Sequence, residues 1–150
     1  MNRELFMSSQ LFLISISYSI IRSQFLLTFS LITTYTGSSL FYIFYKENGF
    51  FHKLDIVTSR TTCVFNLMYT LIYMRPIYIS FILLHNMVLT YIISCIMYYN
   101  KNPLWYKCHI YFHIWTNITA LIIITEIYMQ NQYTIKNELF YHFHHGTIAS

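Results

Sequence analysis

Charged side chains are scarce in this 150-residue sequence. Asp, Glu, Lys and Arg together make up 9% of it, whereas soluble domains contain about a quarter of such residues. This deficit argues against a soluble globular domain. Glycine occurs three times and alanine twice, so close helix crossings built on small residues are mostly excluded. Any helices must therefore pack through large side chains.

Cysteines and basic residues are also few. The three cysteines, Cys63, Cys95 and Cys108, form no CxxC pair, and their odd number predicts no disulfide framework. The nine Lys and Arg residues are spread thinly along the chain, which leaves no basic footprint for a nucleic-acid partner. The apolar run after Arg3 lacks a small-residue cleavage site, so we expect no cleavable signal peptide.

Long apolar segments account for most of the remaining sequence. Hydrophobic residues reach 56%, and the 15 tyrosines suit membrane interfaces, where one end of the ring is wet and the other dry. A helix needs about 20 apolar residues to cross a bilayer. Five segments approach or reach this length, at about 5–21, 25–45, 56–74, 77–99 and 109–129. We therefore predict an all-α fold, a polytopic transmembrane helix bundle of about five spans.

Short polar stretches separate the predicted spans. They lie at 22–24, 46–49, 75–76 and 100–103, where polar residues, Gly or Pro interrupt the hydrophobicity. The sequence is thus divided into a transmembrane bundle over 1–129 and a polar tail over 130–150.

Basic residues on the loops predict the orientation of the bundle. Five spans place the two chain ends on opposite sides of the membrane. The N-terminal side carries five basic residues (Arg3, Lys46, Lys53, Lys101 and Lys107), and the other side carries three (Arg22, Arg75 and Lys136). The positive-inside rule then predicts a multi-pass integral membrane protein with a cytoplasmic N-terminus.

A histidine pair marks the start of the last predicted span. His109 and His113 are four residues apart, so a helix places them on one face. Two imidazoles at this spacing can hold one metal ion. The five-span topology brings further polar residues to the same side and depth, namely Ser38, Tyr42, His52 and Asp55. Ionisable groups at such a depth are usually paired, directed at a cavity or functional.

The order of these residues resembles the motifs of a known superfamily. Ser38-x-x-x-Tyr42, then Asp55, then His109-x-x-x-His113 is similar to the pattern of alkaline ceramidases and adiponectin-receptor-like membrane hydrolases. In that superfamily the histidines hold zinc, and water activated by the metal attacks an amide. The resemblance covers about 34–124.

The resemblance implies a role for each matching residue. His109 and His113 would be zinc ligands, Asp55 would orient a histidine or act as a base, and Ser38 would donate to a developing oxyanion. Tyr42 stands where the family has its first histidine, and five spans are fewer than the usual seven. Either His52 replaces the missing ligand or the site is inactive.

Two classes of function follow from these features. The first is an intramembrane zinc-dependent hydrolase that cleaves an amide or ester of a lipid drawn from the bilayer. The second is a non-enzymatic membrane protein or accessory subunit with a membrane-protein partner. In that case the histidines face headgroups or tyrosines, and Asp55 only stabilises a helix N-terminus. Haem ligation by His85 is a further alternative without a motif.

Overall fold

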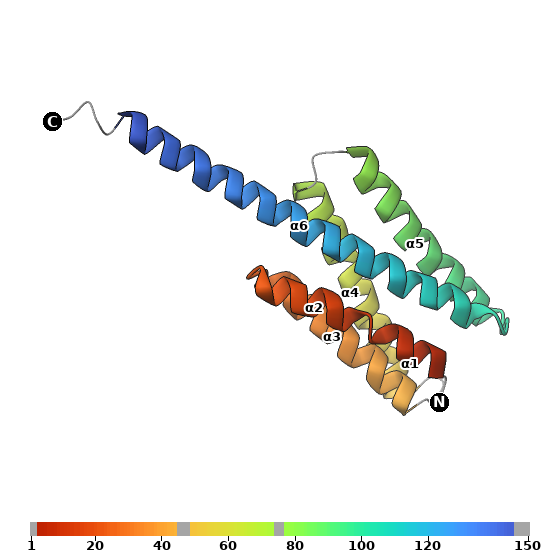
Figure 1. Cartoon of the computed structure of the whole chain (residues 1–150). Helices are drawn as coiled ribbons and strands as arrows, with labels where there is room; N and C mark the ends of the chain where they lie inside the picture. The colour runs from red at the N-terminus through yellow and green to blue at the C-terminus, as the bar shows by residue number, and fades with distance from the viewer. Residues whose placement is uncertain (1–2, 45–48, 74–76, 146–150) are drawn as a thin grey trace.

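The computed structural model describes residues 3–44, 49–73 and 77–145, and these are almost entirely α-helical (Figure 1). No strand occurs within these ranges, so the predicted all-α fold is confirmed. The predicted turns at 46–48 and 75–76 lie outside them. The helices are α1 (Arg3–Ser9), α2 (Phe12–Ile21), α3 (Phe25–Ile43), α4 (Phe50–Tyr73), α5 (Ile77–Tyr99) and α6 (Trp105–His145).

The first apolar segment is broken into two helices, α1 and α2. The hydroxyl of Ser8 donates to the carbonyl of Leu5 at 2.8 Å, one turn back. The amides of Gln10 and Leu11 bond to carbonyls only three residues back, both at 3.2 Å, which tightens the turn between the helices. Serine side chains that bond to the preceding turn commonly bend helices in this way.

Among the described residues, four stretches of helix are long and apolar enough to cross a membrane. They are Arg3–Ile21, Phe25–Ile43, Phe81–Tyr99 and Trp105–Asn137. The third predicted span, 56–74, corresponds to α4, which has 24 residues but contains no stretch apolar enough to be counted among these. The chain therefore has the composition of an integral membrane bundle, in which α4 is the long helix without such a stretch.

The two faces of α4 explain its polarity. A stripe of polar side chains at helical spacing is buried inside the bundle: His52, Asp55, Ser59, Thr62, Asn66 and Thr70. The opposite face exposes large apolar residues, including Val57, Val64 and Leu71, whose side chains are 58–70% exposed. A polar interior with an apolar exterior suits a lipid environment. Exposure of apolar side chains to lipid carries no free-energy penalty, and the buried polar groups hydrogen-bond to one another.

A polar seam joins α3 to α4. Ser30, Thr34, Ser38 and Tyr42 repeat every four residues along α3, and all four are buried. The hydroxyl of Ser30 lies 3.1 Å from that of Thr62, which also contacts the hydroxyl of Thr34. Hydrogen bonds between helices contribute about 0.6–2 kcal/mol each in membranes. This seam sets the register in which Ser38 meets α4.

The close approach of α3 and α4 depends on Gly37. A methyl group added at Gly37 would lie 2.6 Å from the hydroxyl oxygen of Thr58, well inside contact distance. We therefore expect Gly37→Val to destabilise the bundle by about 1–3 kcal/mol, the usual cost of overpacking. Thermal unfolding in detergent, followed by circular dichroism, should show a lower midpoint.

Thr36→Val is the matched control for this prediction, because Thr36 neighbours Gly37 on α3 and is exposed. Its unfolding midpoint should equal that of the wild-type protein. Equal stability of Gly37→Val and the wild type would show that the two helices do not need the glycine.

Helix α6 continues far beyond the last predicted span. Its 41 residues extend over about 60 Å at 1.5 Å per residue, twice the thickness of the hydrocarbon core. The N-terminal half packs against α5 and the other helices, whereas the C-terminal part protrudes from the bundle (Figure 1). The polar tail is therefore helical as far as His145, and side chains 131–137 are exposed.

Candidate functional site

The histidine pair of α6 lies in the interior of the bundle. His109 is 8% exposed and His113 is fully buried. Their ring centres are 4.8 Å apart, because one helical turn places both side chains on the same face.

Each histidine is held by a serine from another helix. The hydroxyl of Ser94 on α5 lies 3.1 Å from Nδ1 of His109, and that of Ser8 on α1 lies 2.9 Å from Nδ1 of His113. Since Ser8 donates its hydrogen to the carbonyl of Leu5, it accepts the Nδ1–H of His113. The lone pair of His113 is then on Nε2.

The free ring nitrogens of the pair have no hydrogen-bond partner. Nε2 of His109 and Nε2 of His113 are both buried, and neither bonds to another atom among the described residues. Buried polar atoms are nearly always hydrogen-bonded, and each exception needs an explanation. Two such exceptions on adjacent rings form the most unusual feature of this interior.

Tyr42 lies against both histidines. It is fully buried, and its ring centre is 6.4 Å from that of His109 and 6.2 Å from that of His113. Its hydroxyl also has no hydrogen-bond partner among the described residues. The residue that departs from the resembling family therefore occupies the position next to the pair.

Asp55 and Ser38 form a buried pair between α4 and α3. Asp55 is 3% exposed, Ser38 is fully buried, and the Ser38 hydroxyl donates to a carboxylate oxygen of Asp55. No cation pairs with Asp55 in the part of the chain that the structure describes. Because the Ser38 hydrogen is directed at Asp55, donation to an oxyanion would require this hydroxyl to turn.

His52, the expected third ligand, is buried but packs against other aromatic rings. Its ring stacks on Phe41 at 4.8 Å and lies 5.1 Å from the ring of Tyr98. Within residues 3–44, 49–73 and 77–145, no three His, Cys, Asp or Glu side chains are grouped closely enough to hold one ion. His52 lines the same cavity as Asp55 and His109, and its role as the third ligand of the histidine pair stays a prediction.

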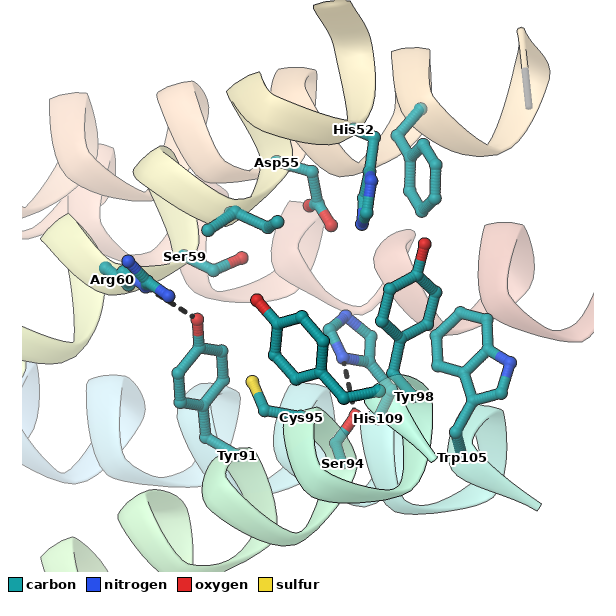
Figure 2. A pocket seen from close by; sticks show the side chains of 13 residues that line it. His52, Asp55, Ser59, Arg60, Tyr91, Ser94, Cys95, Tyr98, Trp105 and His109 are labelled. Atoms are coloured by element: carbon teal, nitrogen blue, oxygen red, sulfur yellow. Dashed lines mark hydrogen bonds between the residues drawn. The ribbon is translucent and has the colours of Figure 1, made fainter. Parts of the chain in front are cut away.

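A small cavity lies beside the site, between α4, α5 and the start of α6 (Figure 2). Asp55 points into it from α4 and His109 from α6, and the Arg60 guanidinium donates to the Tyr91 hydroxyl at 3.3 Å at one end. Its volume is about 40 Å³, which is room for about three or four water molecules at about 10–15 Å³ each. His113 and Tyr42 do not line this cavity.

Sequence reasoning did not identify Ser8 and Ser94. Each lies in an apolar helix with one other serine, Ser9 in α1 and Ser80 in α5, so residue type alone does not distinguish them. His85, in contrast, lies away from the site, with its ring 6.3 Å from that of Phe81 on the same helix.

No protein-family model, curated protein or solved structure matches this chain. Its function must therefore be inferred from the geometry of the described side chains.

Proposed function

We propose that this protein is a metal-dependent membrane hydrolase that cleaves an amide or ester bond of a lipid. The observation that supports this most strongly is that the buried Nε2 atoms of His109 and His113 have no hydrogen-bond partner among the residues that the structure describes. A bound zinc ion would give both lone pairs a partner, and imidazole is among the common zinc ligands. The serines on the two Nδ1 atoms match the outer-sphere hydrogen bonds that orient metal-binding histidines.

Asp55 is the proposed base. A metal ion bound by the histidines would supply Lewis-acid activation of the scissile carbonyl and of water. Asp55 borders the water-sized cavity and is placed to take the proton from a water molecule there and return it to the leaving amine or alcohol. The hydrogen bond from Ser38 holds the carboxylate in this position.

The environment of the cavity favours a lipid as substrate. Toward the other end of the same two helices, α4 and α5 also border an apolar groove of about 480 Å³, lined by Leu67, Leu71, Phe81, Leu84, His85, Val88, Leu89 and Ile92. The proposal places the hydrocarbon chain of the substrate along this groove. The resemblance to alkaline ceramidases supports an amide-linked acyl chain.

We also propose that the N-terminus and the site face the cytoplasm. The end of the bundle with the site carries Arg3, Lys53, Lys101 and Lys107 among the described residues, and the opposite end carries Arg22 and Lys136. The positive-inside rule favours the first group on the cytoplasmic side.

The test is the metal content of the full-length protein purified in detergent. We expect about one zinc ion per chain, and its loss in the His109→Ala/His113→Ala variant, because both lone pairs are removed. His85→Ala is the matched control and should retain the metal, since His85 lies outside the site. Absence of metal from wild-type and variant protein alike would refute the proposal.

A second candidate function is an accessory subunit of a larger membrane complex. The C-terminal part of α6 favours it, since this helix protrudes from the bundle with side chains 131–137 exposed. The histidines would then be structural. The same metal measurement discriminates the two candidates, because a purely structural pair predicts no bound metal.

A further inference from the structure

Within the described ranges, three buried polar atoms at the histidine pair, not two, have no hydrogen-bond partner. The third is the hydroxyl oxygen of Tyr42, whose ring contacts the rings of both His109 and His113. In well-packed interiors a single unsatisfied atom is uncommon. Three on mutually contacting rings are most simply satisfied by one shared partner.

The spacing of the three rings fits a common metal ion. For tetrahedral coordination with bonds of about 2 Å, the centres of two imidazoles bound through Nε2 lie about 5 Å apart, and the centre of a tyrosine ring bound through its oxygen lies about 6 Å from each. The observed separations are 4.8 Å between the histidines and 6.4 and 6.2 Å from the tyrosine. All three agree with such an arrangement.

We infer that the oxygen of Tyr42 is the third ligand of the cation held by His109 and His113. This inference rests on the proposed function for the presence of the cation and adds the identity of its third donor. The cation belongs to the first-row transition metals that accept mixed nitrogen and oxygen ligands, such as zinc or iron. Binding releases the hydroxyl proton to solvent and involves no change in oxidation state.

The other nearby donors, Asp55 and His52, line the neighbouring cavity, which Tyr42 and His113 do not. Asp55 accepts a hydrogen bond from Ser38, and His52 stacks on Phe41. Tyr42, in contrast, is held at the pair by its place at the end of the polar stripe of α3 and by packing with Leu5. Three protein ligands leave the fourth coordination position open, as in catalytic sites.

Ferric iron is the probe for this inference, because a tyrosine oxygen bound to ferric iron absorbs visible light by charge transfer. We expect metal-stripped, full-length protein loaded with ferric chloride to gain a visible absorption band. Tyr42→Phe should lose the band and bind zinc at least about tenfold more weakly. Loss of an outer-sphere hydrogen bond already weakens metal binding about 10- to 100-fold, and loss of a direct ligand should cost no less. Tyr42→His should lose the band but retain zinc.

Tyr111→Phe is the matched control. Tyr111 lies between the two histidines in sequence but is 58% exposed on the outer face of α6. Its variant should therefore keep both the visible absorption band with iron and the wild-type affinity for zinc. Circular dichroism of each variant checks that the helices are intact.

The outcomes separate the two proposals. Iron bound without a visible band, or a band that survives in Tyr42→Phe, would overturn the assignment of Tyr42. If zinc is lost in His109→Ala/His113→Ala but bound at full affinity by Tyr42→Phe, only that assignment fails. If no form of the protein binds metal, both the assignment and the proposed function fail.

Discussion

Replacing Asp55 by asparagine is expected to slow hydrolysis of a lipid amide about a hundredfold to ten-thousandfold, the usual contribution of a positioned general base. The amide of asparagine has nearly the shape of the carboxylate and still accepts the hydrogen bond from Ser38, but it cannot take a proton from water. Asp55 is the only aspartate in the chain. The measurement is the release of labelled fatty acid from a fluorescent ceramide in detergent micelles.

Metal content distinguishes a catalytic role of Asp55 from a structural one. We expect Asp55→Asn to retain its metal and its helical circular dichroism, because His109 and His113 are untouched. Glu126→Gln is the matched control: Glu126 lies on α6, about 25 Å along the helix from His109 at 1.5 Å per residue, and its variant should keep the wild-type rate. An Asp55→Asn protein that hydrolyses the substrate at the wild-type rate would rule out this carboxylate as the base.

Removal of the Ser8 hydroxyl is expected to weaken metal binding about 10- to 100-fold, as loss of outer-sphere hydrogen bonds typically does. The serine oxygen accepts the Nδ1–H of His113 and so keeps the lone pair on Nε2. In Ser8→Ala the ring is free to rotate and to change tautomer. Ser94→Ala should have a comparable effect through His109.

Competition with a zinc chelator measures both affinities. Ser17→Ala is the control, because Ser17 lies on the neighbouring helix α2 and is exposed. We expect the affinity of this variant to equal that of the wild type. If Ser8→Ala and Ser94→Ala also bind zinc as tightly as the wild type, the two serines only satisfy the imidazoles structurally.

Local sequence pattern was sufficient for the features that depend on one helix at a time. Apolar length predicted α3 and α5 closely, and the i, i+4 spacing predicted that His109 and His113 share a face. The polar stripe from Ser30 to Tyr42 was likewise readable, because 3.6 residues per turn determines which side chains of a helix align. These features follow from the geometry of a single helix and can be predicted without knowing which other helices pack against it.

The tertiary structure decided which side chains meet between helices. The rotation and register of packed helices depend on many small contacts, such as the fit of Gly37 against Thr58. The spacing of residues along one helix does not predict such contacts. Sequence order therefore placed Ser38 and Asp55 at one depth but did not reveal their hydrogen bond. Nor did it show that α1 supplies Ser8 to His113, or that the ring of Tyr42 packs against both histidines. The sequence by itself determined the helices and the candidate donors, whereas packing selected the donors that share one site.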